Sequence, residues 1–307
     1  MSSSKLYDSV RELESIIGGT PLLELRRLRE PGMARVFVKL EYMNPTGSHK
    51  DRFVVYALKR MIEEGVVREG DIVVEASSGN TAVSLAWAAT RLGLRAVIVV
   101  EEETSRQKVA LLKALGAEVI KARQGENVKL ARRIAEERGG VLLNQYNSDY
   151  NHEAHYRWTG PELYKQLDGR IDAFVMGMGT CGTVTGVGRY LKEVTGGRVL
   201  VVGVVPRGAA MAGGARERAD RIEGLISSFV PGLFNKYRVY IDELVEVPGE
   251  TAIEYMLRAA RLEGIIGGPS TGANIYAALQ VARRLGEGRV VATLAPDSVL
   301  RYTDLIA

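Results

Sequence analysis

The sequence is poor in the residues from which disulfides and metal centres are built. Its 307 residues include one cysteine, Cys181, and three histidines. A single cysteine excludes an internal disulfide, so we expect a reducing, cytoplasmic environment. Because the three histidines lack the spacing of zinc ligands, we expect no metal site.

Long apolar runs and blocks of like charge are missing as well. No run approaches the roughly eighteen apolar residues that a membrane-spanning helix needs, and residues 1–15 lack a secretory pattern. The net charge of +4 comes from 41 basic and 37 acidic residues mixed along the chain. Basic blocks with interleaved aromatic residues, which mark nucleic-acid faces, are not found. We therefore expect neither a membrane nor a nucleic acid as a partner.

The sequence does contain a regular alternation of apolar runs and amphipathic segments. With 46% hydrophobic and 25% charged residues, a chain of this length can build two packed lobes. Most runs are continuously apolar, which predicts strands buried on both faces in a mostly parallel α/β fold. The predicted strands are residues 35–40, 71–75, 95–100, 118–121, 141–143, 171–176, 199–205 and 289–294. The predicted helices are residues 50–64, 81–92, 105–115, 127–137, 183–193, 250–262 and 272–285.

Two segments, residues 144–160 and 206–237, break this alternation. Both are longer than usual connections, which is typical of functional loops or of joints between domains. We therefore predict a smaller lobe of residues 45–155, and a larger lobe of residues 1–44 and 156–307. Ligands of such folds bind at the carboxyl ends of the strands.

The segment NPTGSHKDR at residues 44–52 places Lys50 in the first turn of a predicted helix, directly after a Pro/Gly turn. Unpaired N–H groups and the positive end of the helix dipole disfavour a second positive charge there, and so favour a neutral, nucleophilic amine. An amine that condenses with an aldehyde needs such a setting. Lys50 is our candidate Schiff-base lysine. The competing interpretation is a solvated surface charge.

The segment at residues 177–183 matches the dinucleotide-binding pattern G-x-G-x-x-G between a predicted strand and a predicted helix. An NAD(P)-dependent oxidoreductase is therefore one interpretation. The next strand ends in Pro206-Arg207, where the pattern for NAD expects an acid to hold the ribose hydroxyls. An arginine at this position could serve NADP, so this interpretation stays open.

A site for one phosphate monoester is the alternative interpretation of this loop. Thr180 and Thr183 can donate hydroxyl groups, and the backbone N–H groups of residues 179–183 face outward at a helix start. We interpret Cys181, inside the loop, as a small residue in a tight turn rather than a reactive thiol.

A third loop, Ser77-Ser78-Gly79-Asn80-Thr81, leaves a predicted strand and starts a predicted helix. One of its polar residues is expected to cap that helix. A cap needs a single side chain, and this loop offers four hydroxyl or amide groups. The surplus groups could bind a substrate carboxylate, with Asn80 reaching a cofactor oxygen.

Together with GPSTGA at residues 268–273, these segments strongly resemble the cysteine synthase and cystathionine β-synthase family. The resemblance covers nearly the whole chain, in the family's order. It includes GTPL at residues 19–22, QYN at 145–147, TGPE at 159–162 and PDS at 296–298. The family implies a two-lobe α/β fold with mostly parallel sheets, like tryptophan synthase β (fold type II), and pyridoxal 5'-phosphate as cofactor.

The resemblance also implies roles for individual residues. Lys50 would carry the cofactor covalently, Asn80 would bind its ring hydroxyl and Ser270 would meet its pyridine nitrogen. The cofactor phosphate would be held by Gly179, Thr180, Cys181, Gly182 and Thr183. The substrate carboxylate would be bound by Ser77, Ser78, Gly79, Thr81 and Gln145.

A neutral partner such as Ser270 weakens the pyridine as an electron sink, which disfavours transamination and favours loss of a β-leaving group. We therefore expect an activated serine, O-phosphoserine or O-acetylserine, to react with sulfide and give L-cysteine, with Lys50 as general base. Sulfide could arrive free or on a carrier protein, and the resemblance implies a homodimer. Alternatives with the same cofactor are cystathionine formation and serine or threonine deamination. A further alternative is an idle paralogue that binds another enzyme.

Arginines near residues 207–221 suggest a phosphate-bearing donor, because the guanidinium group matches a phosphate dianion in shape and charge. Arg207, Arg216, Arg218 and Arg221 precede a Phe-Val-Pro sequence at residues 229–231. We expect Arg218 or Arg221 to bind the substrate phosphate. The competing interpretation is a solvated loop face.

Overall fold

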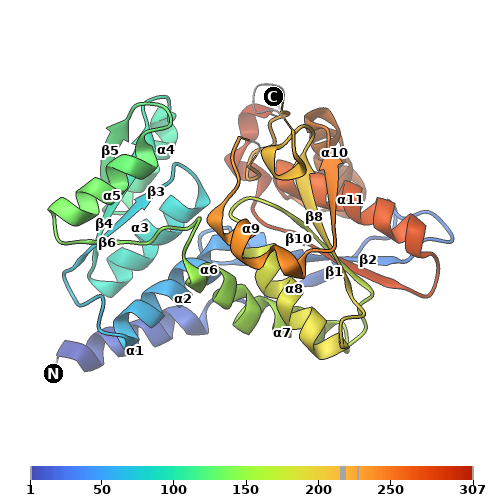
Figure 1. Ribbon diagram of the computed structural model, residues 1–307, viewed down its shortest axis with the longest axis horizontal. Helices are drawn as coiled ribbons and strands as arrows, with labels where there is room; N and C mark the ends of the chain where they lie inside the picture. Colours follow the sequence, from blue (N-terminus) through green and yellow to red (C-terminus); the bar gives the residue numbers. More distant parts are fainter. Residues whose placement is uncertain (1, 215–218, 227, 306–307) are drawn as a thin grey trace. The chain divides into compact units, whose positions relative to one another are not determined.

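The structure is a computed structural model that describes residues 2–214, 219–226 and 228–305. The chain divides into two compact units (Figure 1). The first unit comprises Met1–Ile17 and Asn44–Asn151, and the second comprises Gly18–Met43 and His152–Ala307. Within the described ranges, no helix combines the length and apolarity that crossing a bilayer requires.

The first unit is built on a parallel four-stranded sheet in the order β5-β4-β3-β6. Helix α5 packs against one face, where its alanine and isoleucine side chains meet Val74, Val97 and Val99. Helix α3 packs on β3 and β4, and α2 packs on α3. The strands are β3 (Ile72–Ala76), β4 (Arg95–Glu101), β5 (Glu118–Ala122) and β6 (Val141–Leu142). The helices are α1 (Ser2–Ser15), α2 (Lys50–Glu63), α3 (Asn80–Leu92), α4 (Arg106–Ala114) and α5 (Asn127–Glu137). Helix α6 (Asp149–Ala154) begins in the first unit and ends in the second.

The N-terminal helix corrects the predicted lobe boundary. We assigned residues 1–44 to the larger lobe, but residues 1–17 belong to the first unit. Helix α1 packs on α2 and α3 because Leu6, Val10 and Leu13, spaced as one helical face, are buried. The Lys59 ammonium on α2 also donates to Glu14, with N–O distances of 2.7 and 2.8 Å.

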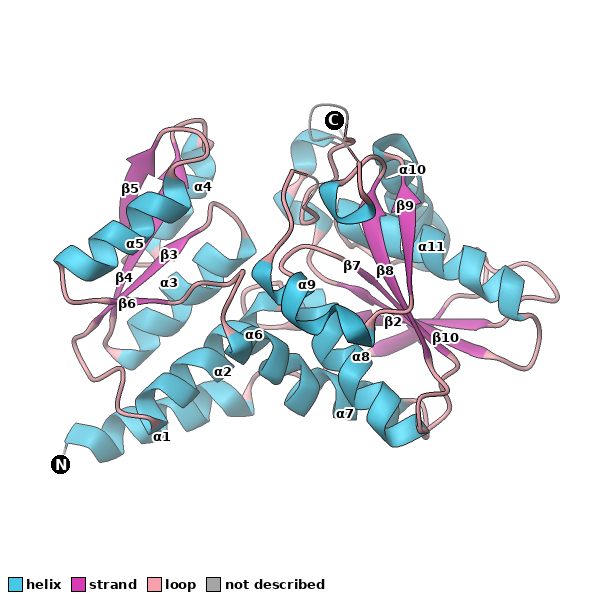
Figure 2. Ribbon diagram, viewed as in Figure 1, coloured by secondary structure: helices cyan, strands magenta, loops and turns pink. Residues whose placement is uncertain are grey.

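The second unit has a six-stranded sheet in the order β1-β2-β10-β7-β8-β9, parallel except for the β1-β2 pair. One face packs against α10 and α11, and the other against α7, α8 and α9 (Figure 2). Its strands are β1 (Leu22–Glu24), β2 (Arg35–Leu40), β7 (Ala173–Gly177), β8 (Leu200–Pro206), β9 (Glu243–Val247) and β10 (Val290–Ala295). Its helices are α7 (Gly160–Gln166), α8 (Gly182–Thr195), α9 (Gly232–Tyr237), α10 (Gly249–Glu263) and α11 (Pro269–Leu285).

The predicted α/β class with mostly parallel sheets is confirmed. The boundary between the two units falls within residues 144–160, where we expected a functional loop or a joint between domains. The segment is not a loop throughout, because α6, a π-helix at His155–Thr159 and α7 follow one another from residue 149. Polar residues broke the periodicity there. Two of them, His152 and His155, are fully buried and hydrogen-bonded to side chains of α8 and of the π-helix itself.

Candidate functional site

In the second unit, the predicted phosphate loop connects β7 to α8. Cys181 caps α8 in a left-handed conformation (φ 70°), which turns the chain sharply into the helix. The first N–H groups of a helix have no carbonyl partner within it, and they lie at the positive end of the dipole. Thr180 and Thr183 are buried at this helix start. The loop therefore has the donors that bind a phosphate group.

The thiol of Cys181 is buried, as expected for a small residue in a tight turn. Its sulfur lies 3.7 Å from the Met211 sulfur and 3.8 Å from the Gly179 carbonyl oxygen. The thiol therefore faces the protein interior, and this residue can serve a bound phosphate only through its backbone.

Ser270 lies on the segment that runs beside the loop. It occupies the first turn of α11 and is buried. A Cβ atom at Gly224 would stand 3.4 Å from the Ser270 hydroxyl oxygen, and one at Gly179 would stand 2.7 Å from the Gly224 carbonyl oxygen. The backbone at residue 224 thus connects the phosphate loop with Ser270, because glycine at 179 permits the close approach. This unit thus places a helix start with unpaired N–H groups close to a buried neutral hydroxyl.

In the first unit, Lys50 is the first residue of α2, as predicted. Its backbone N–H donates to the Ser48 hydroxyl oxygen (3.1 Å), and its amine pairs with the His49 ring nitrogen Nε2. The turn before it is fixed by Asp51, a buried carboxylate that accepts from the Thr46 backbone N–H at 2.7 Å and from the Thr46 hydroxyl. The lysine therefore stands on a rigid helix start, with an imidazole in contact that the sequence analysis did not single out.

The loop at residues 77–81 connects β3 to α3. The expected polar cap is wrong: Gly79 occupies the cap position, and no side chain bonds there. The Ser77 hydroxyl instead accepts from the Gly79 N–H (3.3 Å). Asn80 begins α3, and Ser77, Ser78 and Asn80 are only partly buried. Uncapped N–H groups at a helix start suit a carboxylate ligand.

Thr81 and Gln145 are buried and bond to each other. The Thr81 hydroxyl donates to the side-chain oxygen of Gln145 (2.7 Å), and the Gln145 amide donates to Glu75 (3.0 Å) and to the Ala76 carbonyl (3.3 Å). Sequence reasoning missed Glu75, an acid within the apolar β3 run. Burial raises the pKa of Glu75 to about 8, opposed by hydrogen bonds from Gln145. These hydrogen bonds tie Thr81, at the start of α3, to Gln145 and to the end of β3, and so fix the loop between them.

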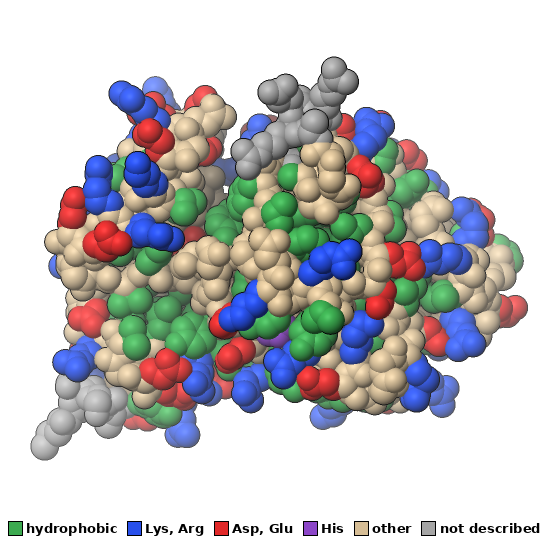
Figure 3. Space-filling model, in the orientation of Figure 1, with side chains coloured by type: hydrophobic (Ala, Val, Ile, Leu, Met, Phe, Trp, Pro, Cys, Tyr) green, Lys and Arg blue, Asp and Glu red, His purple; other side chains and the backbone are tan. Residues whose placement is uncertain are grey.

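The predicted phosphate-binding arginines that the structure describes are paired with acidic residues at the surface. Arg218, and Arg216 beside it, lie outside the described residues. The side chain of Arg221 is 89% exposed and stands 3.7 Å from Glu223, and Arg207 pairs with Asp220 at 3.0 Å. On the face shown in Figure 3, basic and acidic side chains alternate over each unit.

Comparison with known proteins gives consistent matches over the chain. A family model described as pyridoxal-phosphate dependent enzyme matches residues 13–297. A cysteine synthase of Staphylococcus aureus is 39% identical over 95% of both chains. An O-acetylserine dependent cystathionine beta-synthase of Bacillus subtilis is 36% identical over 95% of this chain and 96% of its own.

The solved structures agree. The cysteine synthase of Entamoeba histolytica is 31% identical and superposes with a TM-score of 0.89, covering 95% of this chain and 89% of that one. This match confirms the predicted fold type.

Proposed function

Since the chain belongs to the pyridoxal-phosphate-dependent enzyme family, we propose that it replaces the β-substituent of an activated L-serine with sulfide to make L-cysteine. The observation that carries this proposal is the buried hydroxyl of Ser270, a neutral group placed beside the phosphate loop. The relatives named cysteine synthase support the same reaction.

Pyridoxal phosphate supplies an electron sink to a bound amino acid, and a neutral partner at its ring nitrogen makes that sink a moderate one. Ser270 would be that partner, and Asn80 would bind the ring hydroxyl. The N–H groups of residues 179–183 would hold the phosphate. The moderate sink disfavours transamination and favours departure of the β-substituent.

Lys50 would hold the cofactor and move the α-proton. Its position at a helix start, on a turn fixed by Asp51, keeps the amine in one place, as general base catalysis requires. Ser77, Ser78, Gly79 and the backbone N–H group of Thr81 would receive the substrate carboxylate at the start of α3, while Gln145 accepts from the Thr81 hydroxyl and supports the loop. We further propose a cytoplasmic homodimer, with sulfide either free or delivered by a carrier protein.

A donor panel tests the reaction. The purified protein is expected to absorb at roughly 410 nm, because a cofactor that is joined to a lysine through a protonated C=N bond absorbs there. The band should shift on adding a reactive donor. Steady-state kinetics with sulfide and O-acetylserine, O-phosphoserine or serine then identify the donor. Bound nicotinamide in place of this band would reject the proposal in favour of an oxidoreductase, and a band without turnover would favour an idle paralogue.

Cystathionine formation is the second candidate. It is favoured by relatives named O-acetylserine dependent cystathionine beta-synthase in Bacillus subtilis and Helicobacter pylori. Repeating the panel with homocysteine in place of sulfide separates the two activities. A higher kcat/KM with homocysteine than with sulfide would make this the main reaction.

We expect the Arg221→Ala and Arg218→Ala substitutions to raise KM for O-phosphoserine by roughly tenfold or more, since an arginine–phosphate contact is worth about 1.5–3 kcal/mol. KM for O-acetylserine should change little. Arg258→Ala, which removes an exposed arginine paired with Glu254, is the matched control. Equal effects on the two donors would show that these arginines form a solvated face.

A further inference from the structure

The π-helix at His155–Thr159 contacts the start of α8 through a buried histidine. The ring of His155 is fully buried. Its Nδ1 lies 2.9 Å from the Thr159 hydroxyl oxygen, and its Nε2 lies 3.1 Å from the Thr183 hydroxyl oxygen. The imidazole therefore connects two threonines, of which one belongs to the proposed phosphate loop. A π-helical turn is rare and is frequently found at functional sites.

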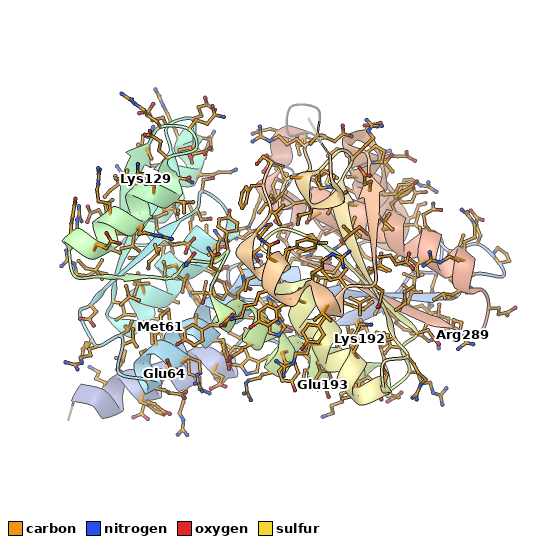
Figure 4. All side chains as sticks on the ribbon, in the orientation of Figure 1. Met61, Glu64, Lys129, Lys192, Glu193 and Arg289 are labelled. Carbon is orange, nitrogen blue, oxygen red and sulfur yellow. The ribbon has the colours of Figure 1, made fainter. Side chains whose placement is uncertain are left out.

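The segment of residues 152–159, which comprises the end of α6 and the π-helix, contacts α8 at further points. His152, one turn before His155, lies 3.0 Å from the Thr185 hydroxyl, and the Tyr156 hydroxyl donates to Glu193 (2.6 Å), which Figure 4 labels on α8. A Cβ at Gly186 would stand 2.3 Å from the His152 carbonyl oxygen, so only glycine allows this approach. The segment and α8 are thus packed as one body, which fixes where the His155 ring stands.

We propose that His155 is a positioning residue that directs the Thr183 hydroxyl onto the cofactor phosphate. A hydroxyl has one proton to donate and two lone pairs. We assign the Thr159 hydroxyl as the donor to Nδ1. With this assignment the ring carries its proton on Nε2 and donates it to the Thr183 oxygen. The Thr183 proton then remains available for a phosphate oxygen. All three hydrogen bonds point toward the anion, so each polarises the next.

This inference rests on the proposed function, because it presumes that the loop binds pyridoxal phosphate. It concerns residues that neither touch the substrate nor take part in the chemistry. Its test therefore measures cofactor binding and not turnover.

His152 provides a matched control on the same helical face. It is also fully buried and contacts a threonine of α8, and its ring stacks on Tyr237 at 3.8 Å. However, the Thr185 hydroxyl donates to the Cys181 carbonyl oxygen (2.7 Å), so its proton is not available to a ligand. Loss of His152 should destabilise the unit without removing a phosphate donor.

The experiment measures the Kd of pyridoxal phosphate for apoenzyme prepared from four variants, together with the melting temperature of each apoenzyme. His155→Phe should raise Kd by roughly ten- to a hundredfold, because the Thr183 hydroxyl is then no longer directed onto the phosphate and its charge-assisted hydrogen bond is lost. His155→Gln, whose amide can reach Thr183, should largely restore Kd. His152→Phe should lower the melting temperature with little change in Kd. Thr159→Val, which removes the Nδ1 partner, should weaken binding several-fold and serves if His155→Phe does not fold.

A double-mutant cycle with Thr183→Val tests whether His155 acts through Thr183. Once Thr183 lacks its hydroxyl, His155→Phe should have no further effect on Kd. Additive effects, or equal Kd increases for His155→Phe and His152→Phe, would overturn the inference and leave the proposed function intact. Failure of the unaltered apoenzyme to bind pyridoxal phosphate would overturn both. The phosphorus NMR shift of the bound phosphate should move in His155→Phe and not in His152→Phe.

Discussion

Replacement of Lys50 by alanine is expected to lower kcat by roughly a thousandfold or more with every donor, because a covalent anchor and a general base are lost together. The protein should still fold, since Lys50 heads α2 while its turn is fixed by Asp51 and Thr46. Activity is measured by sulfide-dependent formation of cysteine, and folding by the melting temperature.

Borohydride reduction locates the attachment directly. In the unaltered protein, the reduced cofactor should be recovered on the peptide that contains Lys50. Lys59→Ala, which removes a lysine of the same helix that pairs with Glu14, should retain both the label and the turnover. Persistence of the label in Lys50→Ala would show that another amine carries the cofactor, and the proposed chemistry would then have no base.

The stability of the protein is expected to fall as pH rises from about 5 to 8, and Glu75→Gln should remove this part of the pH dependence. Burial raises the pKa of Glu75 from 4.5 to about 8. Between these values the folded state binds a proton that the unfolded state has released, so the free energy of unfolding decreases with pH. The contribution is fully present below the unfolded pKa and is lost above the folded one. Its size is on the order of 5 kcal/mol.

Denaturant unfolding at a series of pH values measures this slope. The charges of Glu75 and Glu101 both act on Tyr146, and burial raises the pKa of Tyr146 to about 12, beyond the window. Glu101→Gln removes the partly exposed acid on the neighbouring strand and should leave the slope unchanged. Groups such as Glu193, whose pKa is lowered by the Tyr156 hydroxyl, act at lower pH with the opposite sign. An unchanged slope in Glu75→Gln would show that the carboxyl group is ionised in the folded state.

The sequence predicted the largely buried strands β7, β8 and β10, and also the partly exposed strands β5 and β6. Strand β2 was predicted with its observed bounds, because four of its six residues are apolar. Strand β9 (ELVEV) was missed, because its acids leave no apolar run. The helices between residues 149 and 166 were missed because tertiary contacts, not periodicity, satisfy their polar side chains.

In the candidate site, residues with a local sequence signal were predictable, and residues without one were not. Lys50 and the loops at residues 77–81 and 177–183 were predictable, because glycine and hydroxyl residues between a strand and a helix are a local signal. Glu75 also left a signal, because it is a lone acid in an apolar strand. His155 left none, because its role depends on the approach of α8, which no local pattern encodes.

Cys181 has a consequence for an enzyme that works with sulfide. Sulfide solutions that are exposed to oxygen form polysulfides, which convert accessible thiols into persulfides, and such reactions depend on the exposure of the thiol. The only sulfhydryl of this chain is 2% exposed and faces the Met211 sulfur. The catalyst is thereby shielded from sulfur chemistry of the kind that it is proposed to perform.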